Sequence, residues 1–139
     1  MSRTEEIAND ISVLMPMIAR RIFMEFFQTI DLTQTQIFTV MTLYEKTPTR
    51  LTDLSNKLGV AAPTITGIVD RLEKAGYVKR IPDKEDRRVI NVDLTEKGIK
   101  LAKQLRATIK NKWQGMLAKL PHDDSENFLN ILKKVQQSL

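Results

Sequence analysis

Two adjacent arginines, Arg87 and Arg88, stand in a charged segment that also contains Asp83, Glu85 and Asp86. A guanidinium group at the tip of a hairpin can enter the minor groove of DNA, where the negative potential favours arginine. Neighbouring carboxylates can orient such arginines. The alternative is a solvated turn whose charges pair among themselves. The segment therefore favours contact with a nucleic acid, provided that the elements around it form a DNA-binding module.

The other residue types argue against catalysis and against a metal site. The chain has no cysteine, which excludes a thiolate nucleophile and a cysteine-ligated metal. Its one histidine, His122, precedes Asp123 and Asp124, and helix capping explains both acids. The five glycines are isolated and form no phosphate-binding loop. We therefore expect no enzyme, no catalytic or metal-ligating residue and no cofactor.

The formal net charge of +5 and the sequence pI of about 9.6 favour an anionic partner. The net charge is −2 over residues 1–49, +3 over residues 50–100 and +4 over residues 101–139. The longest uncharged run, residues 32–44, has 13 residues, which is too few to span a membrane. The N-terminus is acidic, unlike a signal peptide. We expect a cytoplasmic protein without a membrane segment.

Residues 51–76 have the pattern of two helices joined by a tight turn, which is typical of a helix-turn-helix. Thr52 is the expected N-cap of the first helix, and Gly59 its C-terminal stop. Pro63 fits the first turn of the second helix, and Gly76 ends it. One face of the second helix is apolar at helical spacing. The opposite face comprises Ala62, Thr64, Thr66, Gly67, Asp70, Arg71 and Lys74.

The hydrophobic period then changes to two residues, which indicates strands over residues 77–81 and 90–94. The loop between them, residues 82–88, contains a proline but no glycine, so it is longer and stiffer than a two-residue turn. We expect a β-hairpin whose loop projects as a wing and carries the two arginines.

Long helices precede this module. Apolar residues recur at steps of three or four over Ile7–Phe26, which predicts a first helix. Pro16 lies inside this stretch and predicts a kink or a break near Met15. Thr33 and Gln36 form a capping box, so we expect the next helix to start at Thr33 and to end before the turn residues that follow position 46.

Two further helices follow the hairpin. Thr95 is the expected cap of a long helix that Pro121 ends, and a last helix starts near Asp123, with Glu126 as a possible capping partner. The terminal helices carry more apolar surface than the small middle module can cover. Packing against a second copy of the chain would bury this apolar surface, so we expect a homodimer held by the terminal helices.

With these elements in order, residues 51–98 resemble the winged helix-turn-helix core of the MarR (multiple antibiotic resistance regulator) family of bacterial and archaeal transcription regulators. The matching stretches are LTDLSNKLGV, PTITGIVDRLEKAGYVKR and DKEDRRVINVDLTEKG, and the flanking helices extend the likeness over nearly all of the chain. The resemblance implies a homodimer with interdigitated N- and C-terminal helices. It also implies a recognition helix in the major groove and a wing at the minor groove.

The resemblance implies roles for single residues as well. Arg88 would be the minor-groove arginine, Asp86 its orienting partner, and Arg87 a phosphate contact. Threonine hydroxyls on the recognition helix can reach phosphates or base edges, although plain solvent exposure is the alternative, and Arg71 can bind phosphate or guanine. The recognition-helix positions are Ala62, Pro63, Thr64, Thr66, Gly67 and Arg71.

The chain departs from the family pattern at two positions. Ala61 stands where a serine commonly caps the recognition helix and touches phosphate, so both roles are lost or move to Thr64. Gly67 replaces a larger polar or basic side chain and costs about 1 kcal/mol of helix propensity relative to alanine. We therefore expect less base readout and more reliance on the wing and on DNA shape.

Members of this family often bind a small anionic or phenolic ligand between the dimer helices and the DNA-binding lobes. Methionines and aromatic residues of this chain offer an adaptable apolar lining near such a position, and two arginines could bind a carboxylate. Ordinary core and dimer packing is the alternative for the apolar side chains, and snorkelling surface charge for the arginines. The candidate ligand-binding residues are Met17, Arg20, Arg21, Met24, Met41 and Tyr44.

Together these patterns predict a mostly α-helical fold with a small β-hairpin wing, in one domain over residues 1–139. The winged helix-turn-helix core would span about residues 33–98, between dimerisation helices at about 4–30 and 95–139. The expected function is a bacterial or archaeal repressor that binds a pseudo-palindromic double-stranded DNA operator as a homodimer. Two alternatives stay open: a ligand-independent architectural DNA binder, and a winged-helix module that binds an acidic protein.

Overall fold

The computed structural model describes the backbone of all 139 residues and every side chain except those of residues 25–27. The expected apolar position at Phe26 therefore lies outside the described side chains. The chain divides into two compact units, the winged-helix unit (Met1–Leu105) and the C-terminal unit (Arg106–Leu139).

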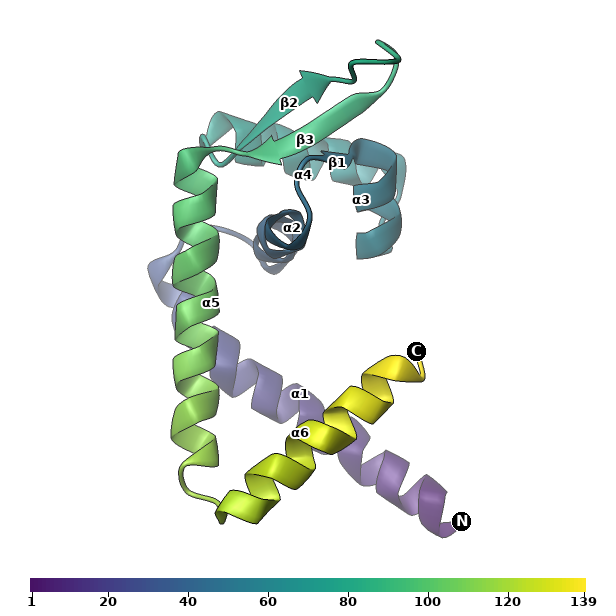
Figure 1. The fold of residues 1–139 in the computed structure, drawn as a ribbon, viewed down its shortest axis with the longest axis vertical. Coiled ribbons are helices and arrows are strands. Elements are labelled where there is room, and N and C mark those ends of the chain that lie inside the picture. Colours follow the sequence, from purple (N-terminus) through teal and green to yellow (C-terminus); the bar gives the residue numbers. More distant parts are fainter. The chain divides into compact units, whose positions relative to one another are not determined.

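The winged-helix unit combines helices with a small antiparallel sheet (Figure 1). The strand order is β1-β3-β2, and β2 and β3 form a hairpin that extends beyond the helices. This confirms the expected fold, which is mostly helical with a β-hairpin wing. The elements are α1 (Arg3–Thr29), α2 (Gln34–Glu45), β1 (Thr49–Arg50), α3 (Leu51–Leu58), α4 (Ala62–Lys74), β2 (Val78–Pro82), β3 (Ile90–Leu94) and the first part of α5 (Glu96–Leu117).

The core of the winged-helix unit is built from α2, α3, α4, the sheet and the start of α5. Burying each large aliphatic side chain contributes about 1.5–3 kcal/mol relative to leaving it exposed. α1 joins this core through its C-terminal part, where Ile22 is buried and the ring of Phe23 meets Phe38 edge to face, with centroids 5.9 Å apart. The fully buried side chains include Ile37, Val40, Leu43, Leu54, Ile65, Val69, Leu72, Val92 and Leu105.

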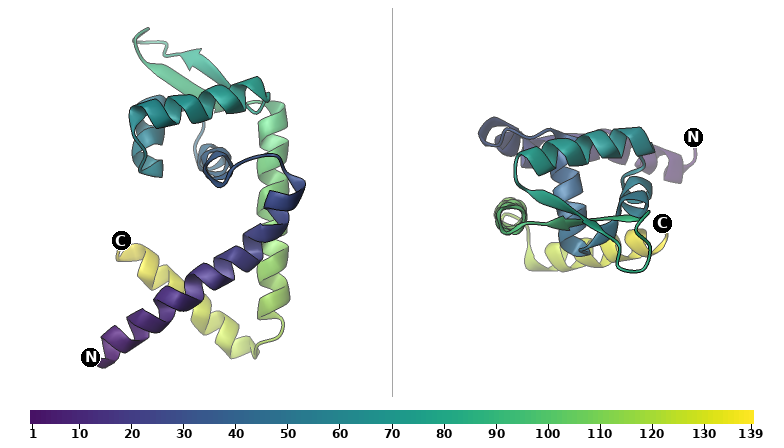
Figure 2. Two further views of the ribbon diagram at one scale, coloured as in Figure 1. Left: turned by 180° about the vertical axis from the view of Figure 1, so that it is seen from behind. Right: turned by 90° about the horizontal axis from the view of Figure 1, so that it is seen from above.

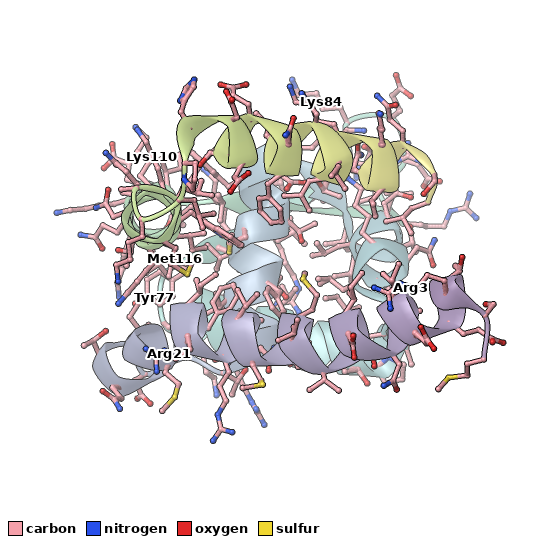
Figure 3. All side chains as sticks on the ribbon, turned by 90° about the horizontal axis from the view of Figure 1, so that it is seen from below. Arg3, Arg21, Tyr77, Lys84, Lys110 and Met116 are labelled. Atoms are coloured by element: carbon pink, nitrogen blue, oxygen red, sulfur yellow. The ribbon has the colours of Figure 1, made fainter. Side chains whose placement is uncertain are left out.

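Helix α1 runs without interruption through Pro16, so a break near Met15 is wrong. A proline removes one backbone donor and crowds the carbonyl four residues earlier, here that of Ser12. The other hydrogen bonds of this 27-residue helix outweigh that local loss. Arg3 and Arg21 lie toward its two ends in Figure 3, and side chains surround the helix between them. Among the described residues, no helix has the length and apolarity needed to cross a membrane.

Helix α2 begins as predicted. Thr33 Oγ1 accepts a hydrogen bond from the backbone nitrogen of Gln36 at 3.2 Å, and Gln36 Oε1 accepts one from the backbone nitrogen of Thr33 at 2.9 Å. This reciprocal pair satisfies two donors that a helix start leaves without intrahelical partners. The helix ends at Glu45, before the turn into β1, which was also expected.

The two-residue strand β1 changes the expected start of α3. Residues 49–50 pair with residues 91–92 of β3, so the backbone stays extended until the chain turns helical at Leu51. Thr52, the expected N-cap, lies inside the first turn instead, and no side chain caps the helix. Gly59 ends α3 as predicted, because its left-handed φ of 65° suits the turn.

Helix α4 has Pro63 in its first turn, as predicted, and its N-cap residue Ala61 provides no side-chain hydrogen bond. The expected loss of a helix cap at position 61 is therefore confirmed. Strand β2 begins at Val78, one residue later than expected, because the backbone nitrogen of Tyr77 still bonds to the carbonyl of Leu72 at 2.9 Å. Strand β3 has the predicted bounds.

Helix α5 starts at a close contact with the end of α4. Thr95 caps it as predicted, since its Oγ1 accepts from the backbone nitrogen of Gly98 at 3.1 Å. The same hydroxyl donates to the carbonyl of Gly76 at 2.5 Å, and the Thr95 nitrogen donates to the carbonyl of Tyr77 at 3.1 Å. A Cβ atom at position 98 would lie 2.0 Å from the Tyr77 oxygen. Only glycine fits where α5 approaches the backbone of Tyr77 this closely.

The C-terminal unit contains the rest of α5 and helix α6 (His122–Gln137). The rings of Trp113 and Phe128 join the two helices, with centroids 5.8 Å apart. Helix α6 starts one residue before the expected position, and its N-cap is Pro121 without a side-chain cap. Glu126 is therefore no capping partner, and its Oε1 lies 3.9 Å from His122 Nε2 instead.

We predict that Gly98→Ala lowers the free energy of unfolding by about 3 kcal/mol, because the added methyl group collides with backbone rather than with a movable side chain. Gly115→Ala is the matched control, since a Cβ there meets nothing within 4 Å and alanine favours the helix by up to about 1 kcal/mol. Urea unfolding at one protein concentration measures both. Equal effects at the two positions would contradict the close contact.

Candidate nucleic-acid interface

Helix α4 turns one face to the core and the other to solvent. Ile65, Val69 and Leu72 are fully buried, which fixes the rotation of the helix about its axis. Figure 2 shows α4 lengthwise, with the hairpin beside it. Thr66 Oγ1 donates to the carbonyl of Ala62 at 3.0 Å, so this hydroxyl keeps its lone pairs as acceptors. The sequence-predicted positions Ala62, Pro63, Thr64, Thr66, Gly67 and Arg71 are all exposed.

Arg80 of β2 ties the hairpin to the outward face of α4. One terminal nitrogen lies 2.6 Å from Asp70 Oδ1 and the other 2.8 Å from Glu73 Oε1. The backbone nitrogen of Arg80 also donates to Glu73 Oε2 at 3.0 Å, and a side-chain nitrogen reaches the carbonyl of Thr66 at 3.4 Å. The arginine side chain is only 24% exposed. This arginine clamp holds the wing and the recognition helix in one geometry.

The wing loop is organised around Asp83. Its Oδ2 accepts from the backbone nitrogens of Glu85 and Asp86, both at 3.2 Å. Its Oδ1 accepts from Asn91 Nδ2 at 3.0 Å, which ties the loop to β3. The backbone nitrogen of Asp83 donates to the carbonyl of Val89 at 3.0 Å. Asp83 therefore shapes the loop itself and does not orient an arginine.

The Asp83 carboxyl is held in its charged form. The hydrogen bond from Asn91 is the main cause that lowers the pKa of Asp83 below its ordinary value of 3.8. The hydrogen bonds from the backbone of Asp86 and Glu85 and the positive charge of Arg50 lower the pKa further, whereas burial opposes them. The loop geometry thus rests on an ionised carboxylate throughout the neutral pH range.

Asp86 and Arg88 meet as the family pattern implies. Asp86 Oδ1 accepts from the backbone nitrogen of Arg88 at 3.0 Å and lies 3.3 Å from its Nε. The Arg88 side chain is 92% exposed, so its terminal nitrogens point into solvent with the Nε side held. Arg87 is exposed next to it. The arrangement presents two exposed guanidinium groups at the end of the wing, and Asp86 orients that of Arg88.

The predicted ligand-binding residues line neither of the two cavities found among the described residues. Met17, Arg20, Arg21 and Met24 are exposed on α1, whereas Met41 and Tyr44 are half-buried on α2. The cavities at the base of the wing and on α5 are lined by other residues.

The MarR family model matches residues 32–90, which include the helix-turn-helix and most of the hairpin. The HTH-type transcriptional regulator SarZ of Staphylococcus haemolyticus is 30% identical over 105 residues, which cover 76% of this chain and 70% of SarZ. The chain belongs to the MarR family. It is accordingly a DNA-binding transcription regulator, in a family of regulators rather than enzymes.

Solved structures with the same fold cover most of the chain. A MarR family protein from Bacillus stearothermophilus aligns with a TM-score of 0.85 over 99% of this chain and 98% of that one, at 24% identity. Staphylococcus aureus MepR bound to ethidium bromide aligns with a TM-score of 0.65 over 91% of this chain and 94% of that one, at 26% identity.

The chain covers 70% of the length of SarZ. It covers 48% of the length of a second curated relative, the HTH-type transcriptional regulator YfiV of Bacillus subtilis.

Sequence reasoning on this MarR-family chain missed the arginine clamp. The sequence pattern places Arg80 in a strand and indicates no partner for it. Its two acidic partners lie seven and ten positions away, on α4. One signal in the sequence could have indicated this ion pair. Asp70 and Glu73 lie three residues apart and therefore on one face of α4, and the strand that follows contains an arginine that can bind both acids.

We predict that Arg80→Ala lowers the free energy of unfolding by about 1–2 kcal/mol, because Asp70 and Glu73 lose charge-assisted hydrogen bonds. Lys79→Ala is the matched control on the same strand, where the side chain is exposed, and should change stability by less than about 0.5 kcal/mol. Urea unfolding at constant ionic strength measures both. If the two variants are equally stable, the clamp contributes nothing to the fold.

Proposed function

We propose that this MarR-family chain is a homodimeric repressor that binds a pseudo-palindromic operator near a promoter and blocks transcription. The observation that carries the proposal is the arginine clamp, which joins the exposed face of α4 to the wing within one protomer. A twofold axis would then present two such pairs to half-sites about 10 bp apart. A regulator of a bacterial or archaeal chromosome works in the cytoplasm, and we propose this compartment.

Each DNA-contacting element has its own role in this proposal. The side chains of Thr64, Thr66 and Arg71 face the major groove from α4, where hydroxyls and a guanidinium group can reach phosphates or base edges. Arg88, held by Asp86, enters the minor groove, and Arg87 contacts a phosphate. A Cβ at Gly67 would meet nothing within 4 Å, so α4 carries a gap there and the wing supplies more of the specificity.

The test is selection of bound duplexes from a random pool at about 150 mM salt, followed by titrations with the enriched duplex. We predict that Arg88→Ala weakens binding by about 1–3 kcal/mol and lowers the slope of log affinity against log salt by about one. Lys103→Ala removes the same charge from an exposed site on α5 and should leave the slope unchanged. An unchanged slope in Arg88→Ala would remove the wing from the mechanism.

The same selection separates the two alternatives. Weak binding without an enriched sequence would contradict the repressor and favour a winged-helix module that binds an acidic protein. An enriched sequence whose affinity no small anion or phenol alters would favour a ligand-independent architectural binder.

Exposed apolar side chains support the homodimer. In the winged-helix unit, Ile7, Ile11 and Leu14 of α1 are between 44% and 55% exposed. In the C-terminal unit, no residue of α6 is buried among those described, although four large aliphatic residues line it. Apolar surface on this scale marks an association site in a soluble protein. The α6 residues are Leu129, Ile131, Leu132 and Val135.

We predict that Ile131→Asp shifts the protein from dimer to monomer and reduces operator binding, since a charge would be buried at the interface. Gln136→Asp is the matched control, because it introduces the same charge on an exposed polar position of the same helix. Sedimentation equilibrium measures the association constant of each. A dimer of unchanged affinity in Ile131→Asp would contradict dimerisation through α6.

We further propose that a small anionic or phenolic effector releases the DNA. The proposed contacts are Met17, Arg20, Arg21 and Met24 of α1 with Met41 and Tyr44 of α2. The support is the exposure of the two arginines and the likeness to MepR, which has been solved with ethidium bromide. Ethidium is a planar cation. The likeness to MepR therefore supports binding of a small molecule, but it does not support a negative charge on that molecule.

A further inference from the structure

A cavity of about 420 Å³ that opens to solvent lies at the base of the wing, between the end of α2, β1, α3 and β3. Its volume is in the range of small-molecule sites. Three cations and one carboxylate line it, so its net charge is positive. The charged and amide side chains that line it are Lys46, Arg50, Asp53, Asn56, Lys57 and Asn91.

The three cations of this cavity are available to a ligand. Within the described part of the chain, neither Lys46, Arg50 nor Lys57 has a carboxylate oxygen within 4.0 Å. This contrasts with Arg80, whose guanidinium group is already shared between two acids. Unpaired cations around a concave site concentrate positive potential where an anion can enter.

The backbone beside the cavity is held in place by strand pairing and by the turn before β1. Arg50 pairs with Asn91 across the β1–β3 ladder, so two lining residues from distant parts of the sequence are neighbours. The turn before β1 is anchored twice: Thr47 Oγ1 donates to the Asp93 carboxylate, and Thr49 Oγ1 donates to the carbonyl of Lys46 at 2.5 Å. Because this backbone is already ordered, a ligand has to order mainly the side chains that bind it.

A chain of hydrogen bonds leads from this cavity to the wing arginine. Asn91, at the cavity, donates to Asp83 Oδ1 at 3.0 Å, and Asp83 Oδ2 accepts from the backbone nitrogen of Asp86 at 3.2 Å. Asp86 in turn holds the backbone nitrogen and Nε of Arg88. The positive charge of Arg50 acts on the Asp83 carboxylate as well. Two cavity residues therefore contribute to the loop that carries Arg88.

We propose that this cavity binds a small hydroxylated anion, a phosphate or carboxylate compound, and that its occupancy weakens DNA binding through the wing. The three cations bind the anionic group. Asp53 can accept from a ligand hydroxyl, and the amide of Asn56 can donate to or accept from one. The amide of Asn91 has a second N–H that can donate to the ligand while the first holds Asp83. The site is distinct from the proposed effector contacts on α1 and α2.

The direction of the coupling follows from charge. A bound anion neutralises positive charge close to the DNA-binding surface and draws Arg50 and Asn91 toward itself, which weakens their hold on Asp83. The loop then no longer presents Arg88 in one orientation. Because coupling is reciprocal, DNA lowers the affinity for the anion by the same factor. This regulatory step rests on the proposed DNA-binding function, whereas the site itself does not.

The site is tested on DNA-free protein with glycerol 3-phosphate and, separately, citrate, at ionic strength kept constant with chloride. We expect both probes to shift the NMR signals of the side-chain amides of Asn56 and Asn91 with saturation. Arg50→Gln should weaken binding about tenfold or more, since it removes a charge-assisted contact. Lys79→Gln, which removes an exposed cation outside the cavity, should leave affinity unchanged. Lys57→Gln repeats the test in case Arg50→Gln unfolds.

Two outcomes would overturn the site: no saturable shift with either probe, or equal binding by wild type, Arg50→Gln and Lys57→Gln. A third result is also decisive. If duplex DNA shifts the two amides while neither probe does, the cavity contacts the DNA backbone and the small-anion proposal is wrong.

The coupling is tested separately, with the enriched duplex and the probe that binds. The probe should lower duplex affinity in wild type and in Lys79→Gln but not in Arg50→Gln. A probe that binds the cavity without changing duplex affinity would overturn the link to the wing. Failure to bind any duplex would contradict the proposed function, and the amide shifts would still report on the site.

Discussion

The position of one guanidinium group, that of Arg80, fixes the hairpin relative to helix α4. Arg80 stands on the first strand of the hairpin and is held by Asp70 and Glu73 on α4, the helix that we propose enters the major groove. A winged helix-turn-helix must present two elements at a fixed separation, because both grooves are engaged by one rigid body. The hydrophobic core sets the depth of α4, but apolar contacts are not directional. The directional bonds of the clamp set the angle between helix and wing.

The wing uses two of its carboxylates for different tasks, although they lie close together in sequence. Asp83 holds the loop backbone, Asp86 holds Arg88, and Glu85 is exposed without a comparable task. A hairpin loop without glycine cannot rely on left-handed residues for its shape. The side chain of Asp83 replaces that conformational freedom with hydrogen bonds to backbone donors. The loop therefore keeps a defined form while its arginines remain solvent-exposed.

Local signals in the sequence predicted most of the elements, because caps and stops act within a few residues. Thr33, Gly59 and Thr95 all mark helix ends as expected. The start of α3 was missed, since β1 has no periodicity of its own and exists only through pairing with β3. The arginine clamp and the cavity were missed for the same reason. Their members come from separate elements, and only the folded chain brings them together.

The net charge of the chain shows why composition alone does not describe an interface. The net charge counts every cation equally, whereas the cations of the folded chain differ in their ion pairs. Arg80 is neutralised by two acids, and Arg88 is held by Asp86 through Nε. Arg50 has no carboxylate oxygen within 4.0 Å among the described residues. Only cations that remain unneutralised release counterions when they meet a phosphate. The salt dependence of DNA binding therefore reports on exposed cations such as Arg88 and not on Arg80 in the clamp. The cations of the cavity beside the wing keep their positive charge and can bind a different anion.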